Sequence, residues 1–169
     1  MSGTLEQTDG QWRLRFTRWL SQPPETVWCA LTEPEHLAAW FPTDIEGERA
    51  TGAILQFVFR NGEGPTIEGR MLTYDPPALL EFRWGEETMR FELRADGEGT
   101  LLTFLNTFDE LGKAARDATG WDVSLDVLGH HLAGKELPWN PRRRWQDVHP
   151  SYVESFGPEA ATIGPPGSP

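Results

Sequence analysis

Four polar side chains in one segment have types and spacings that could do chemistry. Asp126 and His130 lie one helical turn apart, so they could share a metal ion or act as an acid–base pair. They lie opposite the segment's apolar residues, however, which favours a solvated surface pair. Ser124 and His131 lie two turns apart at the edge of the apolar stripe. One or both could therefore point into a cavity as hydrogen-bonding groups.

The remaining candidates for chemistry are isolated in the sequence. Cys29, the only cysteine, lies beside Trp28 in a helical pattern, which is typical of a small buried hydrophobe and not of a nucleophile. His36 and His149 have no partner at a suitable spacing and are interpreted as surface residues. The sequence contains no phosphate loop, dinucleotide fingerprint, nucleophile elbow or spaced metal quartet. We therefore expect no cofactor and no bound metal.

The charge balance is acidic, with 26 Asp and Glu against 15 Lys and Arg and a formal net charge of -11. This charge opposes binding to nucleic acid and to anionic membrane surfaces. The three arginines at 142–144, between Trp139 and Trp145, are therefore interpreted as intramolecular partners of acidic groups. The sequence shows no signal peptide, no apolar run of about 18 residues and no cysteine pair, which predicts a cytoplasmic protein.

A long amphipathic helix near the end of the chain organises these candidates. Trp121, Leu125, Leu128 and Leu132 recur at helical spacing within residues 120–134 and form one apolar stripe. Alternating apolar and polar residues before this helix predict short antiparallel strands, separated by turns rich in Gly, Pro and Asp. The predicted strands cover residues 12–20, 53–60, 66–74, 79–84, 88–95 and 100–107, and a further brief strand in 43–48 is an open alternative.

Two short helices are predicted after the first strand, because Pro24 and Pro34 suit the first turn of a helix. The fold class is therefore α+β: a curved antiparallel sheet of about six to seven strands wrapped around the long helix. We expect a flexible N-terminus at 1–11, one domain at 12–137, an extension at 138–156 that docks through its aromatic residues, and a flexible tail at 157–169.

Several motifs occur in an order that resembles a known family. Pro23–Trp28, Ala30–Glu35 and Ala39–Phe41 resemble the opening of the AHSA1-like branch of the START-like (SRPBCC) superfamily. Further matches are Tyr74–Pro77 before Leu80–Trp84, then Gly99–Thr103, and Gly120–Trp121 at the last helix. The resemblance implies a helix-grip fold with a cavity between sheet and helix. Where many members carry His after the Thr-Leu-Thr strand pattern, this sequence has Asn106, which can bond a ligand but does not titrate near neutral pH.

The aromatic inward positions and the resemblance together predict that the chain binds a small hydrophobic or aromatic molecule in an internal cavity. The expected lining is Trp40, Phe57, Phe59, Trp84, Phe91, Phe104, Asn106, Trp121, Ser124, Leu125, Leu128 and His131. One alternative is a cyclase or hydrolase that uses Asn106, Ser124 or His131 in the same cavity. Another is a protein-binding module, although an Hsp90-type chaperone is not the expected partner. The extension could also form a homodimer.

Overall fold

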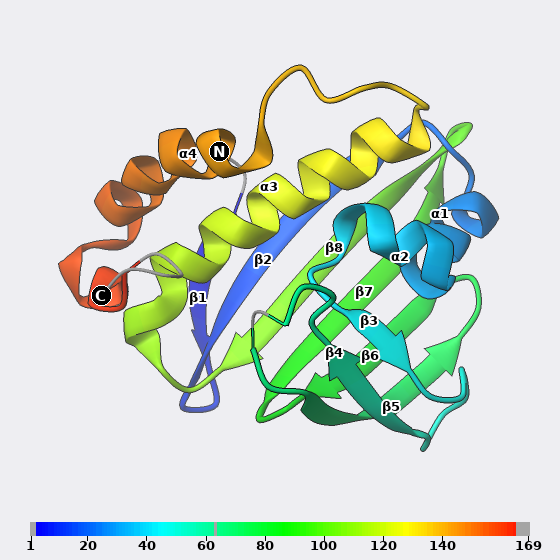
Figure 1. The fold of residues 1–169 in the computed structure, drawn as a ribbon, viewed down its shortest axis with the longest axis horizontal. Coiled ribbons are helices and arrows are strands. Elements are labelled where there is room, and N and C mark those ends of the chain that lie inside the picture. The colour runs from blue at the N-terminus through cyan, green and yellow to red at the C-terminus, as the bar shows by residue number, and fades with distance from the viewer. Residues whose placement is uncertain (1–2, 63, 165–169) are drawn as a thin grey trace.

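The computed structural model describes residues 3–62 and 64–164, in which one antiparallel sheet wraps around a long helix (Figure 1). The sheet has eight strands in the order β1-β2-β8-β7-β6-β5-β4-β3. Their bounds are β1 Thr4–Thr8, β2 Gln11–Leu20, β3 Asp44–Glu46, β4 Ile54–Val58, β5 Ile67–Asp75, β6 Leu79–Trp84, β7 Glu87–Asp96 and β8 Gly99–Phe108. The α+β helix-grip architecture expected from the sequence is confirmed.

The strand that the sequence analysis missed is β1. Residues Thr4–Thr8 pair antiparallel with β2, with Thr4 opposite Arg15 and Thr8 opposite Gln11. The segment expected to be flexible, residues 1–11, therefore contains a paired strand; residues 1–2 lie outside the described part. The residues of β1 are mostly polar and lack the alternating apolar pattern that predicts a strand. An edge strand can form without this pattern, because it gains its hydrogen bonds from one neighbouring strand. Together with β3, β1 raises the strand number to eight.

Three helices position the candidate residues against this sheet. The helices α1, Pro24–Thr32, and α2, Pro34–Trp40, each begin at a proline and carry a glutamate in the first turn, where the helix dipole favours negative charge. The long helix α3, Ala114–Leu132, begins six residues before the predicted range, directly after the 3₁₀ turn η1, Leu111–Lys113. Figure 1 shows α3 lying across the sheet, with α1 and α2 beside its C-terminal half.

The C-terminal extension forms a fourth helix, α4, Pro141–Phe156, which lies alongside α3 in Figure 1. The Asn140 side chain caps its start by accepting hydrogen bonds from the backbone N–H groups of Arg142 and Arg143. Tyr152 is fully buried beneath α4, while Trp139, Trp145 and Phe156 are half-buried. Trp145 also stacks on His149, with ring centroids 4.5 Å apart.

The segment after Gly157 is also more ordered than its Pro- and Gly-rich composition indicates. Residues Pro158–Ala161 form a 3₁₀ turn, η2, and Ala160 is buried. The backbone N–H of Ile163 donates to the carbonyl of Gly112, which ties this turn to η1. The first part of the tail expected to be flexible therefore contains a 3₁₀ turn, and residues 165–169 lie outside the described part. A short turn can be held by a few backbone bonds that composition does not reveal.

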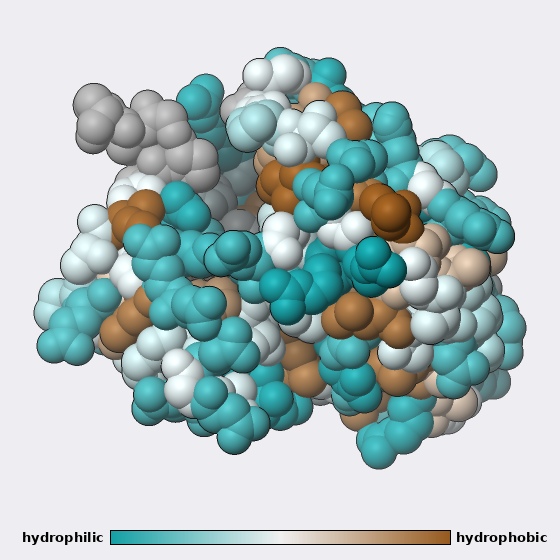
Figure 2. All heavy atoms as spheres, turned by 90° about the horizontal axis from the view of Figure 1, so that it is seen from below, coloured by the Kyte–Doolittle hydropathy of each residue, from teal (hydrophilic) through white to brown (hydrophobic). Residues whose placement is uncertain are grey.

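One core joins the sheet, α3 and the two short helices, and it includes Phe16, Leu31, Phe91, Phe104 and Leu128. Figure 2 shows the molecule from below relative to Figure 1. On this face hydrophilic residues cover most of the surface, with separate hydrophobic patches among them. Among the helices that the structure describes, none has the length and apolar character needed to cross a membrane.

Candidate functional site

The inner face of the sheet and the apolar stripe of α3 meet in a belt of aromatic rings. Phe104 on β8 lies between Phe91 and Trp121, with centroid separations of 4.6 and 4.8 Å. Phe41, directly after α2, contacts both Trp84 and Trp121, at 5.6 and 5.7 Å. The belt arises because alternate strand residues and every third or fourth residue of α3 point toward the same space.

Most of the expected lining residues are buried in or beside this belt: Trp40, Phe57, Phe91, Phe104, Asn106, Trp121, Leu125 and Leu128. Phe59, Trp84, Ser124 and His131 are half-buried. Trp40 is fixed by α1, because its indole N–H donates to the carbonyl of Ala30 at 2.8 Å. Trp84 packs between Phe57 and Phe59, at 4.7 and 6.3 Å, at the end of β6.

The rings of the belt are in contact with one another. Beside the belt, a gap lined by Leu31, Leu55 and Met71 has a volume of about 10 Å³, and a single water molecule needs roughly 10–15 Å³. Rings at centroid separations below 6 Å are in direct contact. A ligand that enters between sheet and helix must therefore displace side chains of the belt.

A polar cluster lies at the end of the belt near the start of α3. Asn106 is fully buried on β8, and its Nδ2 donates to Glu87 Oε1 at 3.0 Å and to the Thr88 carbonyl at 3.4 Å. Glu87 also pairs with Lys113. Since both neighbours of Nδ2 are acceptors, the amide orientation is determined by its partners. The other amide atom, Asn106 Oδ1, is buried and has no hydrogen-bond partner among the described residues.

His131 does not point into the belt but pairs with His36 across the gap between α2 and α3. The His36 Nδ1 and His131 Nε2 atoms lie 2.8 Å apart. Burial, followed by repulsion from His36, lowers the pKa of His131. Glu33 Oε2 lies 3.6 Å from His36 Nε2. The interpretation of His36 as an isolated surface residue is therefore wrong, because its partner lies 95 positions away in sequence and spacing could not reveal it.

The remaining candidates, Cys29, His149 and His130, are half-buried or bonded to the backbone. Cys29 is half-buried, and burial followed by the charge of Glu33 raises the pKa of its thiol, which opposes thiolate formation. His149 is half-buried against Trp145 and not an open surface residue, and burial lowers its pKa. His130 Nδ1 bonds the backbone carbonyl of Asp126 at 2.9 Å and not the carboxylate. In residues 3–62 and 64–164, no group of three or more His, Cys, Asp or Glu is arranged to hold a metal ion.

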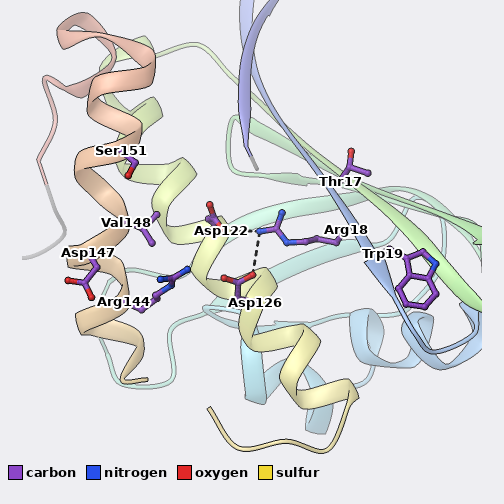
Figure 3. A pocket seen from close by; sticks show the side chains of 9 residues that line it. All are labelled: Thr17, Arg18, Trp19, Asp122, Asp126, Arg144, Asp147, Val148 and Ser151. Atoms are coloured by element: carbon purple, nitrogen blue, oxygen red, sulfur yellow. Dashed lines mark hydrogen bonds and ion pairs between the residues drawn. The ribbon is translucent and has the colours of Figure 1, made fainter. Parts of the chain in front are cut away.

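A second, polar site lies outside the belt, in a pocket of about 530 Å³ between β2, α3 and α4 (Figure 3). At its floor, Arg18 Nη2 lies 2.8 Å from Asp122 Oδ1 and 3.6 Å from Asp126 Oδ1. The hydroxyl of Tyr152 donates to Asp122 Oδ2. Burial raises the pKa of Asp126, an effect that the nearby Arg18 opposes.

Sequence reasoning did not select Arg18, Asp122 or Tyr152 as members of a site. It placed Asp126 opposite the apolar stripe of α3, which is correct, but interpreted Asp126 and His130 as a solvated surface pair. The face is instead covered by α4, and Asp122 is buried. The signal that was available is Arg18, a charged residue at an inward position of an alternating strand, which requires a buried acidic partner.

These features define a helix-grip protein: a curved antiparallel sheet that holds a long helix, with an aromatic interior. The family model described as "Activator of Hsp90 ATPase homolog 1-like protein" matches residues 21–133. The chain belongs to this family, and the resemblance inferred from its motifs is confirmed. Among curated proteins, no relative matches the chain.

Solved structures share the fold at low sequence identity. CalU16 from Micromonospora echinospora is 21% identical, with a TM-score of 0.72 over 92% of this chain and 96% of that chain. A conserved protein of unknown function from Enterococcus faecalis is 20% identical, with a TM-score of 0.74 over 91% of this chain and 90% of that one. A protein from Rhodobacter sphaeroides is 26% identical, with a TM-score of 0.64 over 79% of this chain and 100% of that one.

Proposed function

We propose that this protein binds a small, mainly aromatic or apolar molecule between the sheet and α3, and that the molecule donates one hydrogen bond to Asn106. The observation that carries the proposal is the unpartnered Oδ1 atom of this buried amide. A buried acceptor without a partner costs about 1–3 kcal/mol. A ligand hydroxyl or N–H group would remove this cost, whereas a purely apolar ligand would not.

The surroundings of Asn106 support an aromatic ligand and indicate where it enters. Strand pairing places Trp84 opposite Glu87 and Asn106 opposite Met89, so Asn106 lies on the same inner face as Trp84. Trp84 and Phe59 are half-exposed at this end of the sheet. Because they are less constrained than the buried rings, we propose that they move aside when the ligand enters.

The alternative enzyme function has less support from the geometry. Asn106 is linked through Glu87 to Lys113 at the start of α3, whereas His131 lies in the last turn of that helix and bonds His36. At a rise of about 1.5 Å per residue, the two ends of α3 are roughly 25 Å apart. Asn106 and His131 would therefore act on different parts of a ligand, not on one reacting atom.

The proposal is tested with two aromatic probes that differ in one hydrogen-bond donor. We expect 2-naphthol to bind at least about tenfold more tightly than 2-methoxynaphthalene, because only the hydroxyl can donate to Asn106 Oδ1. Asn106→Leu should remove this difference between the probes. Binding is measured by isothermal titration calorimetry, and native mass spectrometry of freshly purified protein reports any retained ligand.

Leu102→Val, a change at an inner position of the same strand that bears no polar group, is the matched control and should keep the preference for 2-naphthol. Equal affinities for the two probes in the parent protein would contradict the role of Asn106. An absence of binding by both probes would contradict the proposed function itself. Chemical conversion of a bound probe that is lost in Asn106→Leu would replace the binding function with an enzymatic one.

A further inference from the structure

The pocket between β2, α3 and α4 holds two opposite charges that do not meet. Asp126 on α3 and Arg144 on α4 both line the pocket, and Arg144 acts electrostatically on Asp126. No ion pair or hydrogen bond joins these two described side chains. Figure 3 shows Arg144 extending from α4 toward the α3 side of the pocket.

Each of the two charged groups is also incompletely satisfied. The Nε atom of Arg144 is buried and has no hydrogen-bond partner among the described residues. The carboxylate of Asp126 has one ion-pair contact, with Arg18 at 3.6 Å, and accepts no side-chain hydrogen bond within the described part of the chain. Asp122, in contrast, accepts bonds from both Arg18 and Tyr152. The pocket therefore presents the Asp126 carboxylate and the Arg144 guanidinium as opposite charges without a mutual contact, and Asp147 on α4 adds another carboxylate to its lining.

Both groups are held in place by their surroundings, so the separation is built into the fold. The Arg144 guanidinium lies 5.8 Å from the ring centroid of Trp139, a cation–π contact that restrains it. Asp126 is fixed next to the Arg18–Asp122 ion pair on α3. A guest that carries an ammonium and a carboxylate group would satisfy Asp126 and Arg144 together, whereas a guest with one charge would leave the other group unpaired.

The pocket also offers a guest a small apolar surface. Trp19, which follows Arg18 on β2, lines the pocket and is 55% exposed, and its indole Nε1 donates to the Asp96 carbonyl at 3.3 Å. Val148 adds an apolar surface from α4. The volume of about 530 Å³ falls within the usual range for small-molecule sites, roughly 300–1,000 Å³.

We propose that this pocket binds a small zwitterion of the amino-acid type, with the ammonium group at Asp126, the carboxylate at Arg144 and the side chain toward Trp19. This site is separate from the aromatic belt and does not depend on the function proposed for it. The zwitterion site requires only the polar face of α3 and the helix α4 that covers this face.

The test compares L-phenylalanine with two analogues that each lack one charge, phenethylamine and 3-phenylpropanoate. Calorimetric titration of the full chain should show L-phenylalanine binding at least about tenfold more tightly than either analogue, since each charged contact contributes on that order. In a ¹⁵N-labelled sample, the Arg144 Nε–H and Trp19 indole N–H signals should shift on binding, which reports the site without any mutation.

Two variants test which side chain binds the ammonium group and which binds the carboxylate group. Asp126→Asn and Arg144→Gln should each weaken L-phenylalanine binding about tenfold or more, with Arg144→Gln retaining binding of phenethylamine and Asp126→Asn retaining binding of 3-phenylpropanoate. Arg142→Gln, on the same helix but outside the pocket, is the matched control and should not change affinity. Phenethylamine binding as tightly as L-phenylalanine would overturn the zwitterion assignment, as would titration to millimolar L-phenylalanine without heat or shifted signals.

Discussion

Replacing Tyr152 with phenylalanine isolates the hydroxyl group that connects three parts of the fold. This hydroxyl donates to Asp122 Oδ2 on α3 and accepts from the backbone N–H of Gly3 at 3.0 Å. The ring itself is fully buried and packs on Phe156 at 5.3 Å. Tyr152→Phe keeps the ring and its packing, so the measured change reports the hydrogen bonds that join α4, α3 and the start of the chain.

The expected loss can be worked out from these two bonds. A hydrogen bond to a charged group contributes about 1.5–3 kcal/mol, and a buried N–H without an acceptor costs a further amount of about 1 kcal/mol. The free energy of unfolding should therefore fall by about 2.5–4 kcal/mol. For a chain of 169 residues, this corresponds to a melting temperature lower by about 7–11 °C.

The assay is thermal and urea unfolding followed by circular dichroism, with Tyr74→Phe as control. Tyr74 is the only other tyrosine, and it packs on Trp28 at 5.4 Å without a hydroxyl hydrogen bond to a described residue. The urea m-value of Tyr152→Phe should equal that of the parent, because the same surface is exposed on unfolding. A melting temperature within about 1 °C of the control would refute the role of this hydroxyl.

Three other changes test the core, the histidine pair and the extension. Leu125→Trp should destabilise by about 1–3 kcal/mol in urea unfolding, because the belt is already filled; unchanged stability would reveal spare volume. The pKa of His131 is lowered in the folded protein, so the unfolded state binds more protons and stability should fall as pH drops below roughly 6.5, a loss that His131→Gln should reduce. Truncation after Leu137 removes Tyr152 and should lower the melting temperature, and light scattering of both chains tests whether the extension also forms a dimer.

The sequence predicted those elements of the fold whose apolar residues are spaced so that they form one buried face. The strands β6, β7 and β8 and the apolar stripe of α3 follow the alternation and helical spacing of their apolar residues. It did not predict β1, which has no such pattern and is specified by its backbone pairing with β2. The pairing of His36 with His131 was also out of reach, because it depends on how α2 packs against α3.

Arg18 and Asn106 are polar residues at inward strand positions, and the structure accounts for them differently. Arg18 on β2 forms ion pairs with Asp122 and Asp126, so the charge is compensated within the protein. Asn106 on β8 donates to Glu87 but leaves its buried Oδ1 without a partner among the described residues. A leucine of similar volume would avoid this cost, but it would also remove the donor that Nδ2 supplies to Glu87 and to the Thr88 carbonyl. The fold therefore uses the Nδ2 atom and leaves Oδ1 unused. Under the proposed function Oδ1 accepts a hydrogen bond from the ligand, which is why the proposed ligand must carry a donor.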